Sequence, residues 1–199
     1  MNYLAHAYLS FNHSQTLVGN MISDFVKGRQ KDAYEAGIKT GIMLHRAIDH
    51  FTDDHSVTKQ AKQYFRPVYG LYAGAFMDIV YDHFLATDEK IFTNDSLMAF
   101  SQETYTILDQ YYTVLPDHFK AMLPFMKKHN WLYNYHTKLG IQNSFRGLVH
   151  RASYMHESDS AFAIFENNYD DLRDQYRLFF PELRAFAWTY FQSPFPYPV

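Results

Sequence analysis

The sequence contains no cysteine. Disulfide bonds, thiolate nucleophiles and zinc–thiolate sites are therefore excluded, and any metal site must use imidazole and oxygen ligands. The sequence also lacks a run of 18 or more apolar residues, so we expect no membrane-spanning helix. Its first ten residues, MNYLAHAYLS, have no basic segment and are interrupted by His6, unlike a signal peptide. Together these absences favour a cytoplasmic protein.

An excess of positive charge is absent as well. The 18 Lys and Arg residues are outnumbered by 21 Asp and Glu residues, which gives a net charge of −3. We therefore expect neither nucleic acid nor a membrane surface as a partner. Disorder is excluded too, because 47% of the residues are hydrophobic and the chain contains 18 Phe and 17 Tyr.

Proline and glycine are sparse, with seven and eight residues in 199. The long stretches between the prolines have the 3.6-residue periodicity of helices, and no strand pattern or flexible linker is visible. We expect one all-α domain, a multi-helix bundle over residues 1–192, followed by an irregular proline-rich tail at 193–199. Pro181 should break the last helix. The expected helices span residues 2–11, 15–28, 33–53, 56–66, 70–87, 96–114, 117–129, 131–151 and 159–191.

The segment GIMLHRAIDHFTDDHS, residues 41–56, combines helical apolar spacing with an unusual number of ionisable groups. On a helix, His45 and Asp49 are one turn apart and lie within the apolar stripe that Ile38, Ile42 and Ile48 form. A buried imidazole and carboxylate must be paired or bound to a metal ion. The pair is therefore either a hydrogen-bonded core pair or two ligands aimed at one ion.

The segment FMDIVYDHFLA repeats this arrangement with Asp78 and Asp82, and His83 follows directly. The other residues of this segment are apolar almost all round, which is typical of a buried helix. Two carboxylates on one side of such a helix repel each other unless a cation or a proton lies between them. A pair facing solvent is the alternative.

Two more candidates stand in apolar surroundings. Asp24 occurs in GNMISDF, and His6 occurs four residues after Asn2 in NYLAH. A set of imidazoles and carboxylates without thiolate suits Mn²⁺, Fe²⁺, Mg²⁺ or Zn²⁺, and helical bundles often build such sites from inward side chains. Arg46 could bind a phosphate group beside this site.

Four segments of the sequence resemble those of a known protein family: MNYLAHAYLS, GNMISDFVKG, GIMLHRAIDHFTDDHSV and DIVYDHFLA. In this order and spacing they resemble the acyl carrier protein phosphodiesterase family. The resemblance implies an all-α, HD-domain-like fold, because the family is a non-standard branch of the HD phosphatase/phosphodiesterase group. The adjacent His-Asp pair of standard HD enzymes is absent here, and the reversed order occurs instead, for example at Asp49-His50 and Asp82-His83.

The resemblance also implies a reaction. The family hydrolyses the phosphodiester that joins 4′-phosphopantetheine to a serine of holo acyl carrier protein, and it depends on a divalent metal, typically Mn²⁺. We expect Mn²⁺ here, with Mg²⁺ or Fe²⁺ as alternatives. The expected metal ligands are Asp24, His45 and Asp82, followed by His6 and Asp78.

The remaining roles are hypotheses built on this reaction. Asp49 would orient His45 or bind the metal directly, and Arg46 would offset charge that develops on the phosphoryl oxygens. His83 is a candidate acid for the leaving serine oxygen. Asn2, Thr52 and Asp53 would support the site.

The carrier protein is acidic, so a basic rim should surround the site. Lys27, Arg29 and Lys31 follow Asp24 closely and are the expected docking residues. Two other functions fit the same residues: an HD-like phosphohydrolase that acts on a nucleotide or another small phosphodiester, and a non-catalytic metal-binding helical protein. The sequence leaves the oligomeric state and the role of residues 96–192 open.

Overall fold

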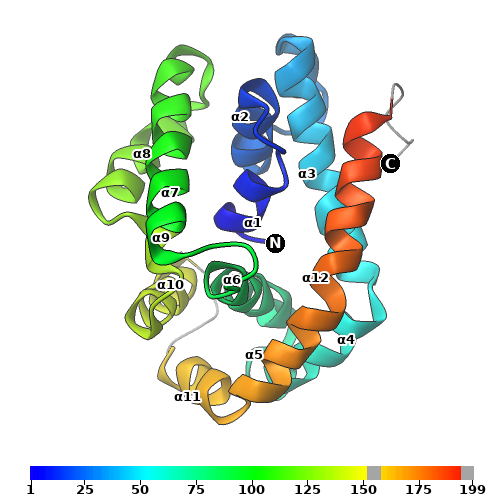
Figure 1. The fold of residues 1–199 in the computed structure, drawn as a ribbon, viewed down its shortest axis with the longest axis vertical. Coiled ribbons are helices and arrows are strands. Elements are labelled where there is room, and N and C mark those ends of the chain that lie inside the picture. The colour runs from blue at the N-terminus through cyan, green and yellow to red at the C-terminus, as the bar shows by residue number, and fades with distance from the viewer. Residues whose placement is uncertain (152–157, 194–199) are drawn as a thin grey trace.

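The fold is built from helices. The structure, a computed structural model, describes residues 1–151 and 158–193, and these ranges contain no strand. The expected all-α fold is therefore confirmed (Figure 1). The helices are α1 (Tyr3–Tyr8), α2 (Ser14–Ile22), α3 (Ala36–Asp54), α4 (Ser56–Ala61), α5 (Arg66–Tyr69), α6 (Ala73–Ala86), α7 (Asn94–Gln110), α8 (Asp117–Lys128), α9 (Trp131–Asn134), α10 (Lys138–Arg151), α11 (Asp159–Asn167) and α12 (Tyr169–Gln192).

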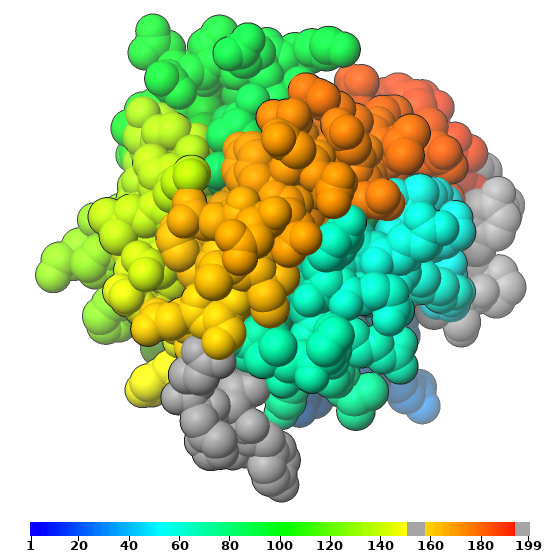
Figure 2. Space-filling model, turned by 90° about the horizontal axis from the view of Figure 1, so that it is seen from below, coloured from blue at the N-terminus to red at the C-terminus, as the bar shows by residue number. Residues whose placement is uncertain are grey.

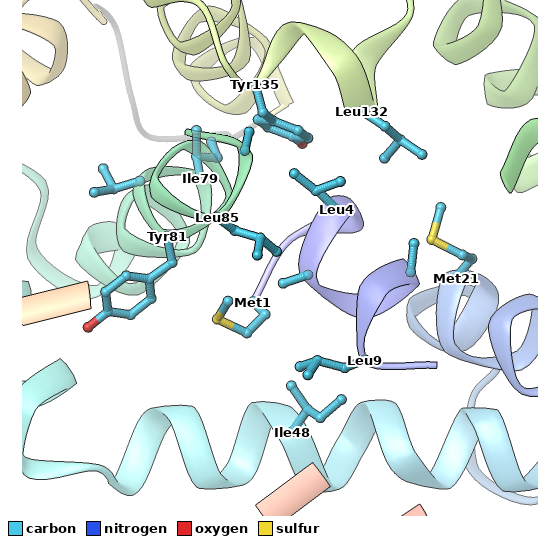
Figure 3. Close-up of a cluster of buried hydrophobic side chains, with 14 of the residues drawn as sticks. Met1, Leu4, Leu9, Met21, Ile48, Ile79, Tyr81, Leu85, Leu132 and Tyr135 are labelled. Atoms are coloured by element: carbon cyan, nitrogen blue, oxygen red, sulfur yellow. The ribbon is translucent and has the colours of Figure 1, made fainter. Parts of the chain in front are cut away.

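Helix α1 lies at the centre of the fold although it has only six residues. A helix this short is not stable alone in water, so packing must hold it. It contacts α2 on one side and α6 on another. Leu4 of α1 is fully buried, and core side chains from α2, α3 and α6 surround α1 (Figure 3). The fold thus fixes the position of the buried side chains of α1, among them His6.

Helices α2 and α3 approach each other as closely as backbones allow. A Cβ atom on Gly41 would lie 2.1 Å from the carbonyl oxygen of Thr16, and one on Gly19 would lie 1.9 Å from that of Ile38. Both distances are far below van der Waals contact, so neither position has room for a side chain. This contact holds Asn20 of α2 against the part of α3 that carries His45.

Helix α6 is buried almost all round, as its sequence predicts. Helices α1, α10 and α12 pack against it, and α12 also packs along α3 and α4. Helix α11 and the first part of α12 cover the lower end of the molecule (Figure 2). None of the described helices is both long and apolar enough to cross a bilayer.

Several expected helix boundaries are wrong. Helix α2 ends at Ile22, and a 3₁₀ turn, η1 (Ser23–Phe25), and a 3₁₀ helix, η2 (Gly28–Ala33), replace the rest of the expected helix 15–28. Gly28 has a φ of +53°, which no α-helix accommodates. Gly70, with a φ of +54°, delays the start of α6 to residue 73 in the same way. The expected helix 131–151 is divided into α9 and α10.

The expected break at Pro181 is also wrong, because α12 runs through it to Gln192. Pro181 is exposed, and so is Arg177, whose carbonyl loses its helix partner to the proline. That carbonyl can bond to water. The buried stripe of Tyr176, Phe180 and Leu183 continues on both sides of the proline and holds the helix together. The chain breaks instead at Asn168, between α11 and α12.

The limits of the domain stay a prediction. Residues 194–199, which make up most of the expected irregular tail, lie outside the described residues.

Candidate metal centre

Two buried histidines form the centre of the candidate site. His6 of α1 and His45 of α3 stack with their ring centroids 3.8 Å apart, and their side chains are 3% and 7% exposed. Asp49, one helical turn after His45, reaches both rings. Its Oδ1 lies 3.3 Å from His6 Nε2, and its Oδ2 lies 3.1 Å from His45 Nε2. The three side chains each offer a ligand atom, all within 4.8 Å of one another, and could hold a metal ion.

Asn20 of α2 fixes the orientation of both rings. The Nδ1 atom of His6 donates to the side-chain oxygen of Asn20 at 2.8 Å. The Nδ1 atom of His45 donates to the backbone oxygen of Asn20 at 2.7 Å. The side-chain nitrogen of Asn20 donates in turn to the backbone oxygen of His6 and to Ser10 Oγ, which fixes its amide orientation. With hydrogen on each Nδ1, each Nε2 is turned toward Asp49. Metal-binding histidines are commonly oriented in this way.

The Nε2 atoms face an excess of acceptor atoms. His6 Nε2 lies 3.2 Å from the backbone oxygen of Met1 besides Asp49, and His45 Nε2 lies 3.1 Å from Asp24 Oδ1 besides Asp49. Lone pairs and carboxylates gathered in a buried place repel one another unless positive charge is present. A proton or a cation must therefore occupy this group, and the nitrogen and oxygen donors fit a divalent metal ion.

The close contacts of His6, His45 and Asp49 shift the pKa of each of these side chains. Burial and the neighbouring His45 lower the pKa of His6. Burial would also lower the pKa of His45, but its hydrogen bonds to Asp24 and Asp49 outweigh burial and raise it. One of the two stacked rings is thus neutral and ready to bind a cation. Asp49 stays ionised, because the Met1 amino group and the histidines outweigh its burial and lower its pKa.

The amino group of Met1 lies beside Asp49 and supplies a positive charge. It is 3.1 Å from Asp49 Oδ1 and 3.1 Å from Asp78 Oδ1. Burial would lower its pKa, but the two carboxylates raise the pKa to about 11. Asp78 is therefore joined to the site through the Met1 amino group.

Asp24 marks the side of the site that is open to solvent. It lies on η1, and its side chain is 67% exposed, compared with 39% for Asp49. Its hydrogen bond with His45 lowers the pKa of its carboxyl group. The structure thus brings four predicted residues together, namely His6, Asp24, His45 and Asp49, with Asp24 at the edge that faces solvent.

Asp82 binds the backbone at the start of α1 and holds that helix in place. It is fully buried, and its two carboxylate oxygens accept the backbone N–H groups of Leu4 at 2.7 Å and Ala5 at 3.1 Å. These are free donors at the start of α1, which a carboxylate stabilises. Burial nevertheless raises the pKa of Asp82 to about 7. Its role as a ligand stays a prediction, whereas its contacts position the helix that carries His6.

His83 is oriented toward other helices. Its Nδ1 donates to the backbone oxygen of Tyr135 at 2.7 Å, and its Nε2 lies 3.0 Å from the hydroxyl of Tyr169. Burial lowers the pKa of His83 to about 4, so the ring is neutral. Its expected role as the acid for the serine oxygen has no contact to support it among the described residues.

The other expected residues lie around the site. Arg46 donates to the backbone oxygen of Val26 at 2.8 Å, which places its guanidinium near the η1 turn. Asn2 caps α1, and its side-chain oxygen accepts the N–H of Tyr3 at 3.0 Å. Two residues turn to other partners: Thr52 Oγ1 donates to the backbone oxygen of Ile48, and Asp53 pairs with Lys62 at 2.6 Å.

Lys27, Arg29 and Lys31 lie on or next to η2. Lys27 and Arg29 are exposed, and Lys31 is half-buried. Their place directly after η1 puts three cationic side chains on the same stretch of chain as Asp24. Their contact with a partner stays a prediction.

Replacing Asn20 by alanine should weaken metal binding. The change removes the acceptor of His6 Nδ1, and outer partners of metal-binding histidines are each worth about 10–100-fold in affinity. We expect a loss of this size in Mn²⁺ affinity, measured by isothermal titration calorimetry on protein whose circular dichroism matches the parent. Asn94→Ala, at the exposed start of α7, is the control and should bind as the parent does. Equal affinity in Asn20→Ala would exclude the orienting role.

Known proteins resemble this chain over most of its length. A sequence model of the family described as acyl carrier protein phosphodiesterase matches residues 1–183. A protein of that name from Photorhabdus laumondii is 30% identical over 182 residues, which cover 91% of this chain and 92% of the relative. Relatives of the same name from Serratia proteamaculans and Yersinia pestis are 30% and 29% identical over 184 residues, 92% of this chain and 95% of each relative. No solved structure matches the chain.

Proposed function

The chain belongs to the acyl carrier protein phosphodiesterase family, and from this premise we propose that it hydrolyses holo acyl carrier protein. Water adds to the phosphorus atom, and the bond between phosphorus and the serine oxygen breaks. The products are apo acyl carrier protein, with its serine hydroxyl restored, and free 4′-phosphopantetheine. A cytoplasmic location, where the carrier protein is made and used, fits this reaction.

One observation carries the proposal: Nε2 of His6, Nε2 of His45 and the Asp49 carboxylate converge, while Asn20 holds both Nδ1 atoms. We propose that His6, His45 and Asp49 hold a divalent cation, with Asp24 completing the set from the solvent side. Mn²⁺ suits these nitrogen and oxygen donors, and Mg²⁺ or Fe²⁺ are the alternatives. When bound, the cation supplies Lewis-acid polarisation of the phosphodiester.

The chain's own residues prepare the reaction around this centre. Arg46 is anchored by one N–H to Val26, which leaves other guanidinium donors for the phosphoryl oxygens of the substrate. Asp82 keeps the first turn of α1 in place, and with it His6. Asp78 holds the Met1 amino group against Asp49. The stacked rings restrict each other's motion, so the ligand atoms are placed before the substrate arrives.

The decisive experiment is intact mass spectrometry of holo acyl carrier protein incubated with this protein, with Mn²⁺ in one sample and a chelator in another. We expect the carrier protein to lose the mass of phosphopantetheine only in the sample with Mn²⁺. Heat-denatured protein with Mn²⁺ is the control for spontaneous loss. An unchanged carrier protein in both samples would contradict the proposal.

Two other functions are tested in the same samples. Hydrolysis of a nucleotide or a small phosphodiester, with the carrier protein left intact, would favour the HD-like phosphohydrolase. Tightly bound metal without hydrolysis of any phosphodiester would favour a non-catalytic metal-binding protein.

Charge reversal at Lys27, Arg29 and Lys31 should weaken docking of the acidic carrier protein. Opposite charges on two surfaces speed their encounter, and salt screens this effect. We expect the triple substitution to glutamate to raise KM for holo acyl carrier protein by about 10-fold or more and to flatten its dependence on salt. Lys90→Glu, an exposed substitution in the loop before α7, is the control and should leave KM within about twofold. Equal kinetics in the triple variant would place the docking surface elsewhere.

A further inference from the structure

A pocket of about 650 Å³ lies between α1, α6, α9 and α10. Its size falls within the range of small-molecule sites, about 300–1,000 Å³. Asn2 and Tyr3 line it from α1, Ile79 lines it from α6, and Trp131, Asn134 and Asn143 line it from α9 and α10. It therefore uses helices of the second half of the chain, to which the candidate metal centre assigns no role.

Two of the residues that line the pocket directly follow, in the sequence, residues of the candidate metal centre. Asn2 lines the pocket, and the preceding residue, Met1, contacts Asp49 with its amino group. Ile79 also lines it, and the preceding residue, Asp78, binds the same amino group. Neighbouring residues have Cα atoms about 3.8 Å apart, so the pocket lining and the residues around the Met1 amino group share two stretches of backbone.

The lining has a distinct chemistry. Among the residues that the structure describes, it contains no carboxylate, and its one fully charged side chain is Lys128, which is exposed. Asparagine amides and hydroxyls provide hydrogen-bond donors and acceptors, and the Trp131 ring, half-buried beside Tyr3, provides apolar surface. Such a pocket suits a long neutral ligand that alternates amide, hydroxyl and alkyl groups.

We propose that this pocket binds the pantetheine arm of the substrate. The inference rests on the proposed function, which places the phosphodiester at His6, His45 and Asp49. The arm beyond the phosphate has two amides, a hydroxyl, a dimethyl carbon and a terminal thiol, and it carries no charge. Its amides match the asparagine side chains, and its alkyl groups match Ile79 and Trp131. The pocket thereby selects the arm, while the metal centre acts on the phosphate.

The two tryptophans of the chain allow a direct test with pantetheine, which has no phosphate. Trp131 lines the pocket, whereas Trp188 is an exposed residue of α12 in contact with Phe11. In NMR spectra of the ¹⁵N-labelled protein, the indole N–H signal of Trp131 should move and saturate as pantetheine is added, and that of Trp188 should stay. A Trp188→Phe variant assigns the two signals.

A blocking variant links the pocket to catalysis. Asn143 is exposed at the lining, so Asn143→Phe fills space with little effect on the fold. We expect it to weaken pantetheine binding and to raise KM for holo acyl carrier protein by about 10-fold or more, with Mn²⁺ affinity unchanged. Ala121→Phe, at an exposed position of α8 outside the lining, is the matched control and should behave as the parent does.

The outcomes separate the two proposals. If the parent hydrolyses holo acyl carrier protein but pantetheine moves neither signal, or moves both equally, the arm does not bind here. Unchanged KM in a folded Asn143→Phe variant would overturn the inference too. If the carrier protein is not hydrolysed, the proposed function fails, and the NMR titration still decides by itself whether the pocket takes pantetheine.

Discussion

Replacing Asp49 by asparagine should abolish metal binding and almost all hydrolysis. Among the described residues, Asp49 is the one carboxylate that reaches both histidines, through Oδ1 and Oδ2 separately, and it also holds the Met1 amino group. Asparagine has nearly the same shape, so the change removes charge and leaves the packing almost intact. Loss of one preorganised electrostatic group at a reaction centre costs about 10²–10³ in rate. We expect at least this loss for holo acyl carrier protein, measured by mass spectrometry, with bound Mn²⁺ measured by elemental analysis.

Asp54→Asn is the control on the same helix. Asp54 is an exposed residue that pairs with His50 and Lys59, and exposed pairs of this kind contribute about 0–1 kcal/mol. This variant should keep the metal content and the rate of the parent. Full activity and full metal content in Asp49→Asn would show that the His6–His45–Asp49 group is a structural hydrogen-bonded cluster.

Replacing Gly41 by alanine should destabilise the whole protein and disturb the site. The new Cβ would lie 2.1 Å from the Thr16 oxygen and 2.8 Å from the Asn20 nitrogen, and both are backbone atoms that cannot rotate away. Helices α2 and α3 would have to separate. Overpacking of this kind costs about 3 kcal/mol, which corresponds to a Tm lower by roughly 6–12 °C for a chain of this size. Because Asn20 would move away from His45, Mn²⁺ affinity should fall in the protein that still folds.

Gly74→Ala gives the opposite result and serves as the control. Gly74 lies in α6, and a Cβ there would meet only the flexible end of the Lys62 side chain, at 3.4 Å or more. Alanine in a helix is favoured over glycine by about 0.5–1 kcal/mol, so Tm should stay equal or rise slightly. A thermal melt of both variants by circular dichroism decides the matter. Equal Tm values for Gly41→Ala and Gly74→Ala would mean that α2 and α3 pack less tightly in solution than in the structure.

The sequence could predict the parts of the site that depend on helical periodicity. His45 and Asp49 are one turn apart on the apolar stripe of α3, and the structure places them side by side at the centre. His6 follows from the same reasoning, since α1 is apolar around it. Periodicity predicts which residues are buried. Because His6, His45 and Asp49 are polar, their predicted burial meant that each needed a partner.

Periodicity does not predict which partner a buried polar group finds. Asp82 has the same apolar surroundings as a ligand would have, yet its oxygens bind the N–H groups at the start of α1. His83 is buried as well, but it faces Tyr135 and Tyr169. The direction of each side chain depends on how α1, α6 and α9 meet, and the spacing along one helix does not contain that information.

Asn20 is the functional candidate that the sequence analysis missed. Its partners, His6 and His45, lie on two other helices, and one of its two contacts uses a backbone oxygen. A signal existed in the sequence, because Asn20 follows Gly19 in an apolar segment and a buried amide must find partners. The close contact of α2 with α3, which the two glycines permit, determines those partners.

The hydrogen bonds of Asn20 also make the site visible to spectroscopy. The Nδ1–H protons of His6 and His45 are buried and bonded to oxygen at 2.8 and 2.7 Å, so they should exchange slowly with solvent. Imidazole protons of most histidines exchange too fast to be observed in water. Two resolved downfield proton resonances would therefore report on the geometry of this site in solution, before any substrate is added, and their loss would reveal a damaged site in a protein that is otherwise folded.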